Sequence, residues 1–440
     1  MARIPQKQLF CWDQIEQLGD LERLRLVLDA LPDEALMRVL EHHRGQGRDD
    51  YPIRPVWNSL LAGIVFQHGS VQQLRRELSR NGQLRWLCGF DLTRGQKAVP
   101  PAYVYTRFFR LLYRHAEQVE AMFDDLVEQL RELLPEFGRH LAMDGKGIRS
   151  AARRRKGLAE MPADGRRDVD ADTGKKTYRG TREDGSQWQR VVEWFGYKLH
   201  LIVDAVYELP LAFEVTKASA SEIPAGRELV KTLGKRHPEL VKEAETLAAD
   251  KGLDDTKLIG GLWDDHGIKP VIDIRNLWKD GEPTRRVSHL SNVVYDYEGT
   301  VYCHCPVSGE HREMAYGGFE KDRAALKYRC PAAHYGLACK GRRRCPIRQA
   351  VRIPLGEDRR VFTPLARSSY AWERAYKRRT SAERVNSRLD VSFGFEQHFI
   401  RGLGKMRLRM GLALLVMLAM AVGRIKAKQG PRLRSLVTAA

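Results

Sequence analysis

The stretch Leu141-Ala-Met-Asp144-Gly-Lys-Gly-Ile-Arg-Ser150 decides the fold of this chain. Apolar residues lead to one carboxylate, and small and basic residues follow it. The pattern predicts a strand that delivers Asp144 to a point where glycines let a ligand approach the backbone closely. A lone Asp at the end of a strand is more often a turn or capping residue. The functional interpretation therefore depends on further carboxylates, which the sequence offers at Asp250 and Glu383.

The chain is strongly basic, with a net charge of +19 and a pI near 9.7 over 440 residues. This charge indicates a polyanionic partner, most simply nucleic acid, although a protein bound to anionic lipid would share it. The N-terminus lacks the apolar core of a secretory signal. The longest apolar run, Met410 to Gly423, is shorter than the roughly 18 residues that span a bilayer. We expect this run to be a buried helix, and we expect no membrane partner.

The middle of the chain predicts an RNase-H-like α/β core, with its first part in residues 136–275 and its completing helices in residues 366–430. Three strands run up and down and then alternate with helices, which is typical of this architecture. The expected strands are 141–148, 195–204, 211–215, 245–250 and 269–274, and the expected helices are 221–233 and 254–266. The first and fourth strands of this fold are neighbours, so Asp144 and Asp250 should lie at adjacent strand ends.

Other segments surround this core. Residues 1–135 are predicted to be all-helical, and two helices joined at His68-Gly69 form either a DNA-reading helix-turn-helix or part of a small bundle. The polar stretch from Arg153 to Arg190 favours a solvated or DNA-facing loop. Residues 276–365 lose helical periodicity and predict a β-rich insertion, and residues 431–440 form a basic tail.

A predicted helix from Ser368 to Ser392 places polar residues along one stripe at i, i+3 and i+4 spacing. These residues are Tyr376, Arg379, Glu383, Asn386 and Asp390. Such a stripe is usually a solvated face, but it is also suited to the wall of a site that handles phosphate.

Two Asp and one Glu on separate elements are suited to hard divalent ions such as Mg²⁺, which prefers oxygen ligands. Two such ions can activate an attacking water or hydroxyl and stabilise the leaving oxygen at a phosphodiester. The sequence has no G-x-x-x-x-G-K-[ST] loop, so ATP use is not indicated, and no G-x-S-x-G element for serine hydrolysis.

The chain resembles bacterial insertion-sequence transposases of the DDE, RNase-H-like superfamily. The resemblance rests on MDGK around Asp144, FGYKLHLIVD, LAADKG around Asp250, and YKRRTSAERVNSRL. The segment RPVWNSLLAGIVFQHGSVQQLRREL resembles the helical N-terminal domain common in that group, so the resemblance covers nearly the whole chain. Its most specific part is the Tyr-x2-Arg-x3-Glu pattern, which Tyr376, Arg379 and Glu383 match.

This resemblance implies that Asp144, Asp250 and Glu383 bind Mg²⁺ or Mn²⁺ and catalyse the reaction. It also implies that Tyr376 and Arg379 position the end of the transposable element.

The family often has Lys seven residues after the Glu, where this chain has Asp390, and Arg388 on the same helix is the expected substitute. Lys198 and His200 alternate onto one face of the second strand and are candidate DNA contacts. A structural polar contact is an equal alternative for His200.

Five of the seven cysteines fall in one segment, which in a cytoplasmic chain favours a metal over disulfides. They are Cys303, Cys305, Cys330, Cys339 and Cys345. Four thiolates would complete a tetrahedral zinc site, but the segment lacks the C-x2-C pairs typical of such sites. Structural Zn²⁺ and free thiols in a β-rich insertion both remain open.

The leading interpretation is a transposase that binds the inverted ends of its element in double-stranded DNA, nicks the DNA and transfers a 3′-hydroxyl. We expect a homo-oligomer on DNA ends and a cytoplasmic, nucleoid-associated location in a bacterium. One rival is a metal-dependent nuclease on the same fold that cuts without joining. Another is a non-catalytic DNA-binding protein descended from a transposase.

Overall fold

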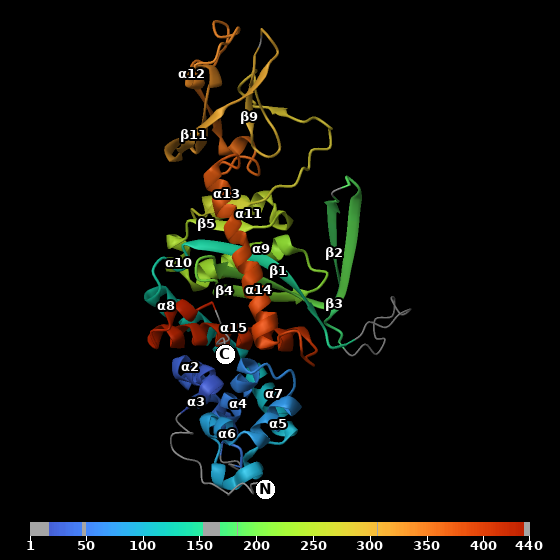
Figure 1. Cartoon of the computed structure of the whole chain (residues 1–440), viewed down its shortest axis with the longest axis vertical. Coiled ribbons are helices and arrows are strands. Elements are labelled where there is room, and N and C mark those ends of the chain that lie inside the picture. Colours follow the sequence, from blue (N-terminus) through green and yellow to red (C-terminus); the bar gives the residue numbers. More distant parts are fainter. Residues whose placement is uncertain (1–16, 46–49, 153–167, 183, 306, 435–440) are drawn as a thin grey trace, which may run out of the picture.

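The computed structural model describes residues 17–45, 50–152, 168–182, 184–305 and 307–434. Figure 1 shows an elongated molecule with a helical end, a central sheet and a β-rich far end. The N-terminal helices occupy the first end, and the segment between the last core strand and the C-terminal helices occupies the other.

The central sheet has the strand order β2-β3-β1-β5-β6, and β4 also pairs with β3. The strands are β1 (His140–Arg149), β2 (Asp172–Thr181), β3 (Gln187–Asp204), β4 (Pro210–Lys217), β5 (Thr246–Ala249) and β6 (Lys269–Ile272). Strand β1 is antiparallel to β3 and parallel to β5, and β5 is parallel to β6. Because β4 pairs with the inner half of β3, the core order is β4-β3-β1-β5-β6. This order confirms the predicted RNase-H-like fold.

The two candidate aspartates stand where the pairing of β1 and β5 ends. Met143 is the last residue of β1 that pairs with β5, opposite Ala249. Asp144 and Asp250 are therefore the next residues along two parallel neighbours, which confirms the predicted adjacency of the first and fourth strands.

The prediction of a loop up to Arg190 was wrong for the residues that the structure describes. Residues 172–181 form β2, which pairs with residues 187–196 of an unusually long β3. Residues 153–167 of the predicted loop lie outside the described residues. The strand pair leaves the sheet at Gly196, where an added Cβ would lie 2.1 Å from the carbonyl oxygen of Ile148. Only glycine allows this close approach, so Gly196 fixes the bend.

The N-terminal part is helical, as predicted. Its elements are η1 (Gly19–Leu21), α2 (Glu22–Ala30), α3 (Glu34–Arg44), α4 (Ile53–Val65), α5 (Val71–Arg80), α6 (Gly82–Cys88), η2 (Leu92–Ala98), α7 (Ala102–Arg114) and α8 (Ala116–Leu133). Helices α4 and α5 are the two helices predicted on either side of His68-Gly69, and the Ser70 side chain caps α5 by accepting a hydrogen bond from the Gln73 amide.

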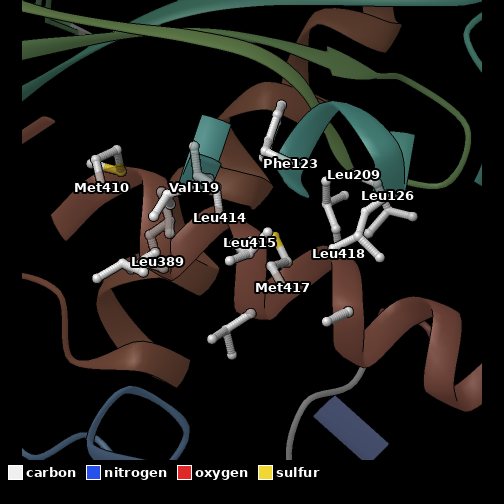
Figure 2. Close-up of a cluster of buried hydrophobic side chains, with 14 of the residues drawn as sticks. Val119, Phe123, Leu126, Leu209, Leu389, Met410, Leu414, Leu415, Met417 and Leu418 are labelled. Atoms are coloured by element: carbon white, nitrogen blue, oxygen red, sulfur yellow. The ribbon is translucent and has the colours of Figure 1, made fainter. Parts of the chain in front are cut away.

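Helix α15 (Leu403–Lys426) joins this helical part to the sheet. It packs against α2, α4 and α8 on one side and against β4 on the other. Figure 2 shows its apolar side chains meeting those of α8, with Phe123 and Leu126 among them. The helix is long and apolar enough to cross a membrane, but 89% of its most apolar window is buried inside the protein. The predicted buried helix is confirmed.

The remaining helices include those that pack on the sheet and those that carry the C-terminal candidate residues. They are α9 (Glu222–Arg236), α10 (Pro238–Glu243), η3 (Lys251–Leu253), α11 (Thr256–Asp264), α13 (Tyr370–Tyr376), η6 (Lys377–Arg379), α14 (Thr380–Phe393) and η7 (Gly430–Arg432). The predicted helix 368–392 is divided into α13 and α14 by the 3-10 turn η6. Helix α13 contacts β5 and β6, η6 contacts β1 and β5, and α14 contacts β1 and β3.

The segment between β6 and α13 folds around a hydrophobic cluster of its own, which includes Val293, Tyr328 and Phe362. One sheet has the order β10-β9-β8-β7 and another the order β11-β12-β13. The elements are β7 (Arg285–Arg286), β8 (Val293–Tyr295), β9 (Val301–His304), β10 (His311–Glu313), β11 (Ala315–Glu320), η4 (Lys321–Arg323), β12 (Ala325–Arg329), α12 (Pro331–Tyr335), β13 (Ala350–Pro354) and η5 (Leu355–Glu357).

Candidate active site

Asp144 lies on β1 and meets α14 across the sheet face. The amide Nδ2 of Asn386 donates a hydrogen bond to Asp144 Oδ2 over 3.2 Å. Asn386 is buried, and its Oδ1 has no hydrogen-bond partner among the described residues. One turn earlier on the same helix stands Glu383, whose carboxylate is exposed. The stripe predicted from the sequence therefore faces the strand that carries Asp144.

Glu383 forms an ion pair with Arg379, with Arg379 Nη1 within 2.5 Å of Glu383 Oε1. Burial opposes the charge of Arg379, but the hydrogen bond and the charge of Glu383 outweigh it and raise the pKa of the guanidinium. The guanidinium also lies over the Tyr376 ring, 5.7 Å from its centroid. Asp250 is close enough to contribute to the electrostatic environment of both Arg379 and Tyr376.

The pKa of Asp144 depends on the charged groups around it, and one of these groups is a second candidate carboxylate. Burial raises the pKa of the Asp144 carboxyl, and the nearby negative charges of Glu383 and Glu222 raise it further. The amide of Gly145 and the ammonium of Lys176 act in the opposite direction. The structure thus brings Asp144 and Glu383 into electrostatic contact and links Asp250 to them through Arg379.

No group of three or more described His, Cys, Asp or Glu side chains is arranged to hold a metal ion. Asp144, Asp250 and Glu383 nevertheless supply the oxygen donors that Mg²⁺ prefers. Arg379 contacts one oxygen of Glu383, Oε1, and the ion pair leaves Oε2 without this partner. Two acids on neighbouring elements have structural partners of their own: Asp254 is buried against Arg360, and Glu373 pairs with Lys377.

Sequence reasoning gave no role to Lys146, which lies two residues after Asp144 on β1. Its ammonium forms an ion pair with Asp390 of α14 and lies 3.6 Å from Glu396 Oε1. The anion at position 390 thus has a cation opposite it on β1. The expected substitute, Arg388, is mostly buried on another side of α14, where it donates to the Glu208 carbonyl. This position does not favour the predicted phosphate contact of Arg388.

Lys198 and His200 share one face of β3, as predicted, but protein groups cover that face. Lys198 Nζ lies 3.3 Å from Glu222 Oε1 and donates to the Ala220 carbonyl over 3.0 Å. His200 is buried beside Thr216, with 2.9 Å between its Nε2 and the Thr216 hydroxyl. Burial lowers the pKa of His200 to about 4. The structural alternative for His200 fits this position.

Glu222 is a further acid at this site that sequence reasoning missed. Its carboxylate lies between Gly145 and Gly252, where added Cβ atoms would lie 3.4 and 3.1 Å from its oxygens. These glycines follow Asp144 and Asp250 by one and two residues. The only sequence signal for Glu222 is its position at the start of α9.

The cysteines of the insertion line one small cavity of about 30 Å³, which Asn292 and Ile347 also line. They are Cys303, Cys305, Cys330, Cys339 and Cys345. Asn292 Nδ2 lies 3.2 Å from Cys345 Sγ, and the Ser308 amide donates to Cys305 Sγ over 3.5 Å. The cluster has zinc-type donors without the arrangement of a metal site among the described residues.

Comparison with known families decides the family to which this chain belongs. The family described as "Transposase DDE domain" matches residues 135–419. The chain belongs to the DDE transposase family. A second transposase domain family matches residues 10–111, as expected for an insertion-sequence transposase. Comparisons with curated proteins and with solved structures gave no significant match.

In this DDE transposase, the turn between α4 and α5 contacts the end of α14. Gln67 Nε2 donates to the carbonyl oxygens of Val391 and Ser392. On α5, Arg75 donates to the Pro100 carbonyl and Arg80 pairs with Glu77. DNA contact by this helix pair stays a prediction. The contact of Gln67 with α14 connects the N-terminal domain to the helix that carries Glu383.

Proposed function

We propose that this transposase binds the inverted ends of its own element in double-stranded DNA, cleaves a strand to give a 3′-hydroxyl, and joins that 3′-hydroxyl to a target phosphodiester, whose own 3′-oxygen leaves. The observation that carries the proposal is the approach of α14 to β1. The hydrogen bond from Asn386 to Asp144 brings Glu383 beside Asp144, and the Arg379 next to Glu383 lies near Asp250. The nearness of these acids, which suit a divalent metal, to a cation that suits phosphate supports the proposal.

Asp144, Asp250 and Glu383 would hold Mg²⁺ or Mn²⁺. Two divalent ions at these oxygens would activate the attacking hydroxyl and stabilise the leaving oxygen of a phosphodiester. Asn386 holds one oxygen of Asp144, which fixes the orientation of that carboxylate. Arg379 pairs with Glu383 in the metal-free protein, and opening of this pair would make Arg379 available to the scissile phosphate. Tyr376 supports Arg379 through the face of its ring.

The net charge of +19 fits a protein that holds several DNA segments through their phosphates. We expect two element ends to be held by a homo-oligomer, and we expect the protein to act at the nucleoid in the cytoplasm.

The test is Glu383→Gln in the full-length protein, with Glu373→Gln as a matched control. Glu373 lies ten residues earlier in the chain and forms an i,i+4 ion pair with Lys377, as Glu383 does with Arg379 at the same spacing. Mg²⁺-dependent nicking and joining of an element-end duplex should fall more than about 100-fold in Glu383→Gln, beyond the usual cost of losing a supporting residue at a metal site. The control should cleave like the parent.

Affinity for the same duplex should persist in both variants, because binding comes mainly from Lys and Arg contacts to phosphates. If Glu383→Gln cleaves like the parent, Glu383 is not a catalytic ligand and the proposed site is wrong. Product analysis of the parent separates strand transfer from simple cleavage.

A further inference from the structure

One segment of the insertion holds most of its excess positive charge. Residues 331–350 contain five cations and no acid, whereas the rest of the insertion, residues 276–330 and 351–365, contains 11 cations and 10 acids. The five cations are Lys340, Arg342, Arg343, Arg344 and Arg348. They all lie in residues 336–349, which join α12 to β13 and are called the basic loop below. Apart from this loop, the insertion is nearly neutral.

Sulfur and apolar contacts hold the backbone of the basic loop in place. Cys339 and Cys345 line the small cavity that the cysteines of the insertion share. Ile347 is only 5% exposed and belongs to the hydrophobic cluster of the insertion. Arg312 of β10 donates a hydrogen bond to the Ala338 carbonyl over 2.7 Å. The loop is therefore attached to the insertion at points that alternate with its cations.

The cations themselves have no protein partners. All five are exposed, and none of their side chains forms an ion pair or a hydrogen bond with another described residue. Elsewhere in the insertion, Arg312 pairs with Glu310 and Arg352 pairs with Glu320. Like charges so close in the chain repel one another, and counterions or a polyanion relieve this repulsion. The basic loop thus presents charge that a polyanion can neutralise.

The basic loop is remote from the N-terminal domain. Figure 1 shows α12 at the end of the molecule opposite the N-terminal helices, with α13 leading from the insertion back to the sheet. Helix α13 continues through η6 into α14, which carries Glu383. The N-terminal domain contacts the last turn of α14 through Gln67. The candidate site therefore stands between the N-terminal domain and the insertion that carries the basic loop.

We infer that the basic loop binds target DNA through its phosphates. The inference rests on the proposed function, which brings two duplexes to the site, and it assigns one of them to this surface. An element end has to be distinguished from other DNA by its sequence, whereas a target supplies a phosphodiester. Cations that replace phosphate counterions hold duplexes of any sequence, because phosphates carry no sequence information.

The side chains of the loop suit a DNA backbone better than base edges. Reading a base calls for a guanidinium held in a fixed bidentate geometry, and no described residue fixes the guanidinium groups of this loop. Tyr335 and Leu337, which are 61% and 47% exposed, lie next to the cations in the chain. These side chains offer apolar contact to the sugars between phosphates. The surface therefore fits a duplex that is held without being read.

The test is the triple variant Arg342→Ala/Arg343→Ala/Arg344→Ala in the full-length protein. Fluorescence anisotropy over a range of KCl concentrations measures its affinity for a random-sequence duplex and for an element-end duplex of equal length. Nicking of element ends and joining of a pre-cleaved end to a plasmid are assayed on the same preparations. The matching triple Lys variant at these three positions keeps the charge.

The control variant is Lys279→Ala/Arg286→Ala/Lys321→Ala. It removes three exposed charges from the same insertion, and none of them forms an ion pair with another described residue. Two of these cations stand next to acids in the chain, Asp280 and Asp322. Thermal unfolding should be alike in all the variants, because the substituted side chains are exposed.

Relative to this control, the triple Ala variant should bind the random duplex roughly 10-fold more weakly at low salt, and its log–log salt slope should fall by about 2–3 units. Joining to the plasmid should fall by a similar factor, while nicking and the affinity for the element end stay near the parent values. The triple Lys variant should keep all these properties, because Lys contacts a phosphate as a point charge.

Unchanged affinity and salt slope of the triple Ala variant on the random duplex would overturn the inference while the proposed function stands. If nicking and element-end affinity fall as much as random-duplex affinity, the loop holds the element end, and its assignment to the target is wrong. A variant altered only in oligomeric state in light scattering would show that the loop binds a second copy of this chain, which also overturns the inference. A parent that neither nicks nor joins element ends overturns the proposed function, and the target role of the loop with it.

Discussion

Asn386 donates a hydrogen bond to Asp144 over 3.2 Å, although the two residues are 242 positions apart in the chain. A second contact between β1 and α14 is the ion pair of Lys146 with Asp390. Two residues of a strand advance about 6.6 Å and four residues of a helix about 6 Å. Strand β1 and helix α14 therefore advance by similar lengths between the two contacts, and Glu383, one turn before Asn386, is near enough for its charge to raise the pKa of Asp144.

We predict that Asn386→Ala lowers the affinity for Mg²⁺ and the cleavage rate about 10- to 100-fold, because a residue that orients a metal ligand is lost. Isothermal titration with Mn²⁺ on the DNA-free protein measures the first effect, and nicking assays measure the second. Ser387→Ala, on the exposed side of the same helix, is the control. Unchanged metal affinity in Asn386→Ala would show that Asp144 needs no such support.

The pair Lys146–Asp390 should behave as a coupled unit. Its side chains are only 15% and 25% exposed, so removal of either partner leaves a partly buried charge. Each single Ala variant should lose about 1–3 kcal/mol of unfolding free energy, and the double variant should lose less than the sum. The exchange Lys146→Asp/Asp390→Lys should recover part of the loss. Additive effects in urea denaturation would contradict the coupling.

The strand order and the elements that carry the three carboxylates could be predicted because buried strands reveal themselves by apolar runs between turns. The pairing of β2 with residues 187–194 of β3 could not be predicted: most of the described side chains along both strands are exposed, so the sequence there has no apolar alternation and looks like a loop. Alternation did place Lys198 and His200 on one face. The alternation of side chains gives no information on α9, whose Glu222 covers that face.

The side of α14 to which each residue turns was also only partly predictable. Helical spacing separated the stripe of Glu383, Asn386 and Asp390 from Arg388. The burial of Arg388 against Glu208 depends on the turn after β3, which lies 180 positions earlier. The pairing of Lys146 with Asp390 depends likewise on tertiary structure.

Asp144 should make the metal-free protein sensitive to pH. Burial raises the pKa of its carboxyl, so the ionised form opposes folding at neutral pH. Asp144→Asn should therefore raise Tm at pH 7 without divalent ions. The gain should shrink as the pH falls through the folded-state pKa toward the unfolded value of about 3.9, because the parent carboxyl is then neutral in both states.

Calorimetry in EDTA-treated buffer at several pH values measures this effect of Asp144→Asn. Asp125→Asn, at an exposed site on α8, is the control and should leave Tm near that of the parent. Added Mg²⁺ should stabilise the parent more than Asp144→Asn. A lower Tm for Asp144→Asn at pH 7 would contradict the cost of burying this charge.

Zinc in the insertion stays a prediction. If zinc binds, purified protein should contain about one Zn²⁺ per chain, and Cys330→Ser or Cys345→Ser should lose it. Both cysteines line the shared cavity, whereas Cys88 is buried in the N-terminal domain and Cys88→Ala should keep the metal. Elemental analysis without zinc would leave the cysteines as free thiols and the insertion intact.

Arg379→Ala should change metal and DNA binding in opposite directions. In the DNA-free protein Arg379 occupies Glu383, so its removal should make Glu383 available and raise the affinity for Mn²⁺. The same substitution removes a cation expected beside the scissile phosphate. Affinity for the element-end duplex should fall, its log–log salt slope should decrease by about 1 unit, and cleavage should slow.

Lys377→Ala provides the control for Arg379→Ala, since it removes a cation of equal charge from the neighbouring pair with Glu373. It should leave Mn²⁺ affinity and cleavage near the parent values. Titration calorimetry for Mn²⁺ and anisotropy for the duplex, on the same preparations, measure both effects. If Arg379→Ala weakens Mn²⁺ and DNA binding alike, Arg379 supports the site in its loaded form, and the ion pair with Glu383 is not a competitor of the metal.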